Sequence, residues 1–319
     1  MEKLKFITPE IEEKLGLLFI SKDDPDELLS LYNKIKEKRK KIKTFCEKHP
    51  EIGKIVQSWH ERTSLHEEAW DLANLERHLN ESKRNASLDE VLLPDNEQGE
   101  MSARIHPESL LNACKFVSLC SQKKSSEMVF SFHPEEYETL GSAMLLRAHA
   151  EMYAHLHGVD KNRIVKNRFR NEKDPLIVLP SAPFEPVKGE FVSTRVSLLL
   201  NWPETGWKHY NPIEQAALVT AEFWRIQPFM DGNKRMALLA ANFILESAGL
   251  NRVVLTRADA KPFMENMKNA ILTRDAHDLA KQYSEIILTR QEKMTDKIRE
   301  NCLEERLGGK FIDDTEFES

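Results

Sequence analysis

The residues best suited to chemistry form one short stretch, Phe229-Met230-Asp231-Gly232-Asn233-Lys234-Arg235. Apolar residues at helical spacing flank it, which predicts a turn between two helices. Gly232 lets the backbone bend and approach a ligand closely, and the first amides of the following helix favour a bound anion. Lys234 and Arg235 add positive charge at the N-terminus of the helix, where the helix dipole disfavours cations. Their position therefore suggests a bound anion. The stretch therefore predicts a phosphate-holding loop, and an ordinary Asp-Gly turn is the alternative.

Two side chains complete this predicted loop. Asp231, placed beside a phosphate, is the natural carboxylate for Mg²⁺, a cation that takes few protein oxygens together with phosphate oxygens. Phe229 would anchor the loop in the core.

The helices on either side of the loop have clear start and stop signals. Asn211-Pro212-Ile213-Glu214 places a cap, a proline and an acid where a helix over 212–226 begins. That helix ends before Gln227-Pro228, because the residue before proline is pushed out of helical geometry. The next helix is expected from Asn233 or Lys234 to Gly249, a left-handed cap. Its apolar stripe is expected at Met236, Leu239, Ala240, Phe243, Ile244 and Ser247/Ala248.

The rest of the chain predicts a mainly α fold. Helical periodicity also covers residues 25–45, 55–79, 107–121, 134–157, 188–201, 258–273 and 275–300. The strand-like run Leu176-Ile177-Val178-Leu179-Pro180 is followed by further prolines, which predicts a short β-hairpin or extended flap. A polar linker at 87–102 separates an N-terminal helical arm (1–100) from a core (101–290) and a charged C-terminal tail (291–319).

Composition limits the classes of function. The 319 residues carry a net charge of −6, which argues against nucleic-acid binding as the main role. We expect no membrane-spanning helix and no secretory signal. The four cysteines form no CxxC pair, which indicates reduced thiols in a reducing compartment. We expect a cytoplasmic protein or an exported effector acting in a host cytosol, and a homo-oligomer stays open.

Residues 227–238 resemble the signature of Fic (Fido) domains, His-x-Phe-x-Asp/Glu-Gly-Asn-x-Arg-x-x-Arg. The matching residues are Phe229, Asp231, Gly232, Asn233 and Arg235. The resemblance extends over roughly 130–290 and includes Asn167-Arg168-Phe169-Arg170 before the flap. The sequence departs from the signature twice, because Gln227 stands in place of the histidine and Leu238 in place of the final arginine.

The resemblance implies transfer of AMP from ATP to a hydroxyl of a protein target. It implies that Asp231 binds Mg²⁺, that Gly232, Asn233, Lys234 and Arg235 hold the phosphates of an adenine nucleotide, and that the flap residues Leu176 to Pro180 dock the target by strand-like pairing. Mg²⁺ and ATP are the expected cofactors if the site is competent.

Gln227 occupies the position of the general base. An amide orients a hydroxyl but does not take its proton near neutral pH, and a missing base costs on the order of 10²–10⁴ in rate. Leu238 offers no charge to a triphosphate. Three explanations stay open: a pseudoenzyme, an enzyme with another base or leaving group, and an engineered His→Gln change. Candidate replacement bases are Glu222, His209, His149, His155 and His157.

Many proteins that resemble this one carry an inhibitory helix with the pattern Ser/Thr-x-x-x-Glu-Gly/Asn. Thr63 to Glu67 resembles it within the helix near 63–79, but Glu68 breaks the last position. A solvated helix is the other interpretation. The alternative function is a non-catalytic interaction module that holds a protein partner through the flap and a basic N-terminal helix around Lys34 to Lys43.

Overall fold

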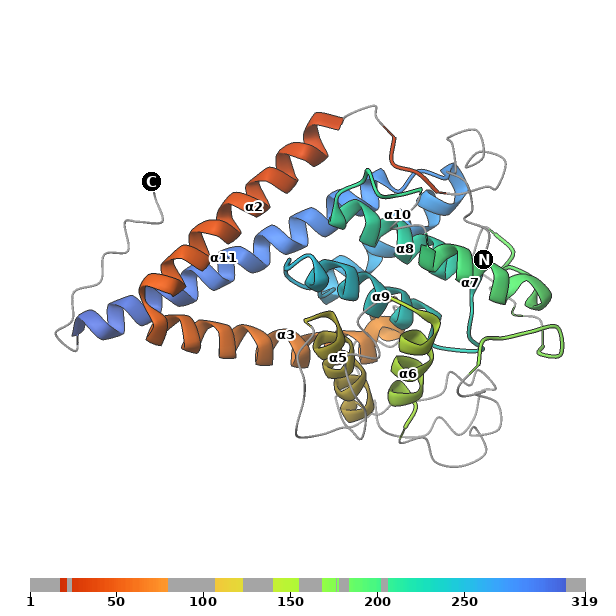
Figure 1. Ribbon diagram of the computed structural model, residues 1–319, viewed down its shortest axis with the longest axis horizontal. Helices are drawn as coiled ribbons and strands as arrows, with labels where there is room; N and C mark the ends of the chain where they lie inside the picture. Colours follow the sequence, from red (N-terminus) through yellow and green to blue (C-terminus); the bar gives the residue numbers. More distant parts are fainter. Residues whose placement is uncertain are drawn as a thin grey trace.

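The computed structural model describes residues 18–21, 25–79, 107–122, 140–154, 168–175, 177, 184–201 and 206–307. These residues form the helices α2 (Pro25–Lys48), α3 (Pro50–Leu79), α5 (Pro107–Ser121), α6 (Ser142–Met152), α7 (Gly189–Asn201), α8 (Pro212–Ile226), α9 (Asn233–Ser247), α10 (Arg257–Thr273) and α11 (His277–Leu307). The long helices α2, α3 and α11 meet at one end, and α5 to α10 lie together at the other (Figure 1).

Helices α8 and α9 form the centre of the fold and pack along each other. Helix α8 begins with a complete capping box, in which Asn211 and Glu214 bond each other's backbone. Residues 216–224 of α8 and 235–245 of α9 are buried without interruption. A helix that is buried on all sides belongs to a core, so the loop between α8 and α9 is held by two helices of the core.

The fold is mainly α, as the sequence predicts. The helices over 107–121, 212–226 and 258–273 are confirmed within one residue at each end. Helix α6 begins at Ser142 after Gly141, which is extended and is the N-cap. The predicted helix start at residue 134 lies outside the described residues. The strand-like flap is outside the described residues except for Ile177, and so is the linker at 87–102.

The burial of α9 differs from the predicted single stripe. Ala237 and Ala241 lie off the stripe and are fully buried, since their small side chains let neighbouring helices approach from a second side. Asn242 is also buried because its amide pairs with both backbone groups of Val253. A stripe of large apolar residues therefore underestimates how much of α9 lies in the core.

Helices α2 and α3 pack against the core. Helix α2 lies along α11, and α3 contacts α5, α10 and α11. The segment 18–21 pairs with the turn between α10 and α11 through a parallel bridge between Phe19 and Asp275. Helix α11 continues to Leu307, so the first part of the predicted C-terminal tail is helical.

A buried group of charges joins α3 to the core. The Arg252 guanidinium donates to Glu68 of α3 at 2.5 Å and to Glu246 of α9 at 2.6 Å. Asn242 also donates to Glu68, and Ser118 of α5 donates to Glu246. Since a buried charge must be paired to be tolerated, these contacts fix where α3 sits.

His60 on α3 is expected to make the free energy of unfolding depend on pH. Burial, with smaller contributions from Arg290 and Arg252 and opposed by Glu61, lowers the pKa of His60 to about 4. In the unfolded chain, His60 is protonated near the ordinary pKa of ~6.5. The free energy of unfolding is therefore unaffected by His60 above that pH and decreases as the pH falls from ~6.5 toward 4. We expect a loss of about 1–3 kcal/mol over this window, measured by urea unfolding at several pH values.

His60→Gln is the comparison for this prediction. The variant loses the titrating ring, so the slope of unfolding free energy against pH between ~6.5 and ~4 should become shallower. A slope that is identical in the two proteins would show that other groups carry the acid sensitivity.

Candidate functional site

The backbone of the loop between α8 and α9 is held by Arg170. Its Nε donates to the Gln227 carbonyl at 2.8 Å, and its Nη2 donates to the carbonyls of Ile226 and Val187. The Arg170 amide also donates to the Pro228 carbonyl. Because Arg170 is buried, it satisfies carbonyls that the end of α8 leaves without helical partners. Arg170, which precedes the predicted flap in the sequence, thus supports the backbone of this loop.

Asn233 closes the loop with both of its amide atoms. Its Oδ1 accepts from the Phe229 amide and its Nδ2 donates to the Phe229 carbonyl, each at 2.8 Å. Asn233 was predicted to hold phosphate, but its side chain is used within the loop. Any contact of Asn233 with a bound anion would therefore come from its backbone amide at the α9 N-terminus.

Phe229 lies in the core beneath the loop. It is fully buried and stacks on the His149 ring, with 3.8 Å between ring centroids and an interplanar angle of 6°. Phe169 and Phe223 also contact it at an angle. His149, a candidate base, is buried here and its Nε2 lies 3.2 Å from the Asp231 carbonyl oxygen. The His149 ring therefore supports the loop through its contacts with Phe229 and Asp231.

The Asp231 carboxylate is partly exposed and held at both oxygens. Its Oδ2 accepts from the Tyr153 hydroxyl at 2.9 Å and its Oδ1 accepts from the Gly232 amide at 2.7 Å. Burial, and then Asp231, raise the pKa of Tyr153 well above its usual value, so the hydroxyl stays a donor. A carboxylate oxygen has two lone pairs. Each oxygen of Asp231 uses one lone pair for the hydrogen bond given above, so each has a second lone pair available to a cation. Sequence reasoning missed Tyr153, which lies far from the loop in the chain.

Gly232 has a conformation and surroundings that exclude a side chain. Its φ is +78°, in the left-handed region, and it is the N-cap of α9 without a side-chain cap. A Cβ here would lie 2.5 Å from Met152 Cε and 2.7 Å from Tyr153 Oη. The backbone therefore approaches α6 closely, and the first amides of α9 face the loop without a capping side chain.

We expect Gly232→Ala to reduce the free energy of unfolding by about 2–4 kcal/mol, from backbone strain and the clash with α6 together. Chemical denaturation measures this loss. Gly249→Ala is the matched control, because φ is +69° but the nearest atom is the mobile tip of Arg39. Equal losses in the two variants would rule out a specific contact between the loop and α6.

The two cations of the stretch differ in their surroundings. Lys234 is partly exposed. Arg235 is buried, and its Nε donates to the Leu72 carbonyl of α3 at 3.0 Å. Arg235 also opposes the rise in the pKa of Tyr153. Helix α3 thus holds the guanidinium that was predicted to bind phosphate.

Gln227 is buried at the point where α8 ends. It adopts a left-handed conformation with φ +52° and ψ +62°, and its Nε2 donates to the Trp224 carbonyl at 2.6 Å. Its side chain cannot titrate near neutral pH. Leu238, the second departure, is also buried in the main apolar cluster.

The other candidate general bases among the described residues have surroundings that do not indicate a role in proton transfer. Glu222 is fully buried and accepts from Arg225 in an ion pair one turn along α8. His209 is exposed and contacts the Tyr210 ring. His155 and His157 lie outside the described residues.

The residues of the candidate inhibitory pattern face another part of the core. Glu67 pairs with Arg290 of α11 at 2.7 Å, and Thr63 is half-buried. The adjacent Glu68, which breaks the pattern, is the buried partner of Arg252. The contact between α3 and Arg235 of α9 is made about one turn beyond Glu68, at Leu72.

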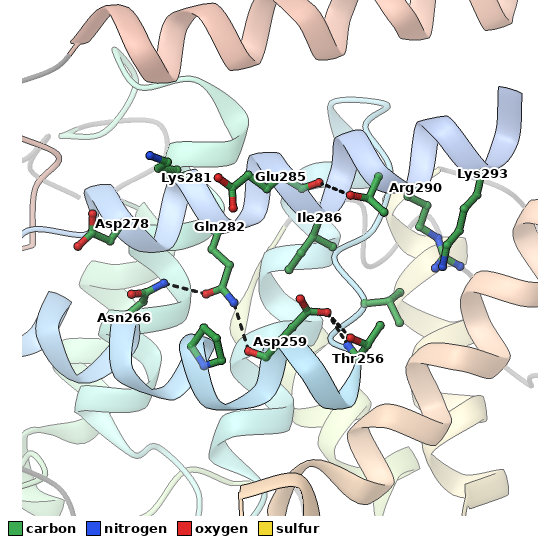
Figure 2. A pocket seen from close by; sticks show the side chains of 13 residues that line it. Thr256, Asp259, Asn266, Asp278, Lys281, Gln282, Glu285, Ile286, Arg290 and Lys293 are labelled. Carbon is green, nitrogen blue, oxygen red and sulfur yellow. Dashed lines mark hydrogen bonds between the residues drawn. The ribbon is translucent and has the colours of Figure 1, made fainter. Parts of the chain in front are cut away.

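A separate groove of about 500 Å³ lies between α10 and α11 (Figure 2). Its central polar groups bond one another: Asn266 donates to Gln282, and Gln282 donates to the Asp259 carbonyl. No predicted site residue lines it. We conclude that this groove is distinct from the loop between α8 and α9.

The described residues contain no group of three or more His, Cys, Asp or Glu side chains that could hold a metal alone. Mg²⁺ takes one or two carboxylates together with phosphate oxygens. Asp231 would supply the carboxylate, and the N-terminus of α9 with Lys234 would supply the phosphate contacts. Among the same residues, no helix is long and apolar enough to cross a membrane.

Solved structures similar to the chain include a segment of Fic-1 from C. elegans, with 17% identity, a TM-score of 0.53, and coverage of 82% of this chain and 71% of that one. A Fic domain containing signaling protein from Bacteroides thetaiotaomicron has 19% identity, a TM-score of 0.52, and coverage of 83% and 94%.

A Fic family protein from Desulfovibrio desulfuricans is also similar, with 16% identity, a TM-score of 0.53, and coverage of 86% and 74%. These likenesses show a shared fold. No curated protein has a significant sequence match to the chain. The model of the Fic/DOC family matches residues 139–245, which contain α6 to α8, the loop and all but the last two residues of α9. Residues 139–245 of this chain are therefore a Fic/DOC family domain.

Proposed function

We propose that this protein is a Fic-type adenylyltransferase-like protein in which AMP transfer from ATP to a protein hydroxyl is weak or absent. The observation that carries the proposal is the state of Gln227. Its amide is buried and bonded to the Trp224 carbonyl where the family signature has histidine. No proton acceptor stands at this position, so an attacking hydroxyl keeps its proton.

The remaining loop supports binding of an adenine nucleotide with Mg²⁺. The divalent cation, when bound, would neutralise phosphate charge. Asp231 is oriented for this role by Tyr153 and by the Gly232 amide. The dipole of α9 and the positive charge of Lys234 favour a phosphate at the same end of the loop.

Helix α3 supplies a second reason for weak activity. Arg235 donates to the Leu72 carbonyl, so its guanidinium is directed in part toward α3. Any gain from binding phosphate through Arg235 Nε must exceed the cost of giving up this buried bond. We therefore expect weak nucleotide affinity while α3 is in place.

Labelled ATP with Mg²⁺ tests the proposal. We expect saturable binding of ATP that depends on Mg²⁺, with protein labelling close to the background without enzyme. Asp231→Ala should remove the Mg²⁺-dependent part of binding, whereas Asp278→Ala, on the exposed start of α11, should not. Rapid labelling of the wild-type protein would contradict the weak transfer, and absence of any ATP binding would contradict the nucleotide site.

The second candidate function is a non-catalytic module that binds a protein partner. The observation in its favour is the exposed basic face of α2, which includes Lys34, Lys36, Lys40, Lys41 and Lys43. Clustered exposed lysines attract acidic surfaces at a rate that falls with salt. Absence of ATP binding under all conditions would favour this second function over the nucleotide-dependent one.

A further inference from the structure

A cavity lies apart from the loop, between α2, α3, α5 and the chain that follows α9. Its volume is about 930 Å³, within the range of small-molecule sites. Much of its wall is apolar, with Ile42, Val56, Leu65, Leu119, Leu250 and Met294 among its lining residues. None of the residues 227–235 lines it. Apolar surface of this extent favours an apolar ligand over water.

Two titratable side chains that line the cavity, Glu246 and His60, already have partners. Glu246 accepts from Ser118 and from Arg252. The ring of His60 lies between Ser64 and Asn251, and its low pKa keeps it uncharged near neutral pH. These two side chains therefore present little unbalanced charge to a ligand.

Two cations at the cavity have no carboxylate partner within the described ranges. Arg39 on α2 donates only to the Ala248 carbonyl, at 3.3 Å, and Lys115 on α5 is half-buried. The acids nearby are engaged, since Glu47 pairs with Lys43 at 3.7 Å and Glu61 accepts from Gln57. Since a hydrogen bond from a cation to an anion is stronger than one to a neutral carbonyl, the half-buried Lys115 ammonium and the Arg39 guanidinium favour an anionic ligand.

We propose that this cavity binds a small amphipathic anion, with an apolar body against the walls and a single carboxylate head at Lys115 and Arg39. The apolar walls account for the body, and the two cations account for the sign and position of the head. This site is independent of the proposed nucleotide site, because the two share no lining residue.

Cys46 is a built-in reporter of occupancy, because it lines the cavity and is half-exposed, whereas Cys114 and Cys120 are buried. Burial raises the pKa of Cys46, so alkylation is measured at mildly alkaline pH and quantified at this residue by peptide mass spectrometry. We expect decanoate to slow alkylation of Cys46 at least fivefold. Decanol should protect more weakly, and decyltrimethylammonium least.

Two variants test the head and the body separately. Lys115→Gln should raise the decanoate concentration for half protection about tenfold, the effect of losing one charge-assisted bond, and leave protection by decanol unchanged. Leu119→Trp should fill the cavity and abolish protection by both. Lys261→Gln, at an exposed position on α10, is the control and should behave as wild type.

Three outcomes would overturn the proposal. One is equal protection by decanoate and decyltrimethylammonium, and another is decanoate protection that Lys115→Gln does not weaken. The third is protection without ligand that grows with protein concentration, which would show that a second copy covers the cavity. Circular dichroism and thermal unfolding confirm that each variant is folded before its result is used.

Discussion

Gln227→His is expected to increase AMP transfer by about 100-fold or more, because a positioned base contributes on the order of 10²–10⁴ in rate. The backbone at this residue is already fixed by Arg170, which donates to the Gln227 and Ile226 carbonyls. The new imidazole would therefore start from the loop geometry described above. Incorporation of label from ATP into protein, at saturating ATP and Mg²⁺, measures the change.

Gln227→Ala is the matched control for that experiment. It removes the bond to the Trp224 carbonyl without adding a base, so labelling should stay at background. If Gln227→His binds ATP but also stays at background, the block lies elsewhere in the site. Buried Leu238 and the contact between Arg235 and α3 are then the remaining causes. Labelling by Gln227→Ala that rises above background as far as labelling by Gln227→His would contradict the assignment of residue 227 as the missing base.

Arg252→Leu is expected to have the largest effect on stability, a loss of about 3–5 kcal/mol, because it leaves buried carboxylates without their cation. Arg252 bonds both Glu68 and Glu246 in the interior. The midpoint of thermal unfolding should fall by roughly 5–15 °C, at a few degrees per kcal/mol for a chain of this size. Calorimetry measures the midpoint, and urea unfolding measures the free energy.

Two comparisons make this result specific. Arg257→Leu removes an exposed arginine at the start of α10 and should change stability by no more than about 0.5 kcal/mol. The double variant Glu68→Leu/Arg252→Leu should recover part of the loss, since it also removes one stranded charge. A double variant less stable than Arg252→Leu alone would show that Glu68 contributes through contacts other than this ion pair.

The sequence predicts the helices well where short signals set their ends. The cap at Asn211 and the proline after Gln227 define α8 to the residue, because these signals act within one turn. The same is true of the loop, whose Gly232 takes the left-handed conformation that only glycine adopts without strain. Local chemistry is therefore enough to place the loop and the helices that hold it.

The contacts that cross the fold could not be predicted in this way. Tyr153 reaches Asp231 from α6, and Arg252 reaches Glu68 from beyond α9. Such pairs depend on which helices pack together, and helical periodicity does not report this. One signal was present, because Ser64, Glu68 and Leu72 follow each other at intervals of four and form one buried face of α3. That spacing marks the face of α3 that meets the core.

The bond between α3 and Arg235 has a consequence for how this protein can change. Its acceptor on α3 is the Leu72 carbonyl, a main-chain atom that every residue type supplies. A scan that replaces the side chains of α3 one at a time would leave the acceptor present in every variant. Mutations can free this arginine only by displacing the helix, so they should be found among the residues that dock α3. Selection for a released guanidinium would then appear as substitutions at Glu68 or Arg252, far from the loop in sequence.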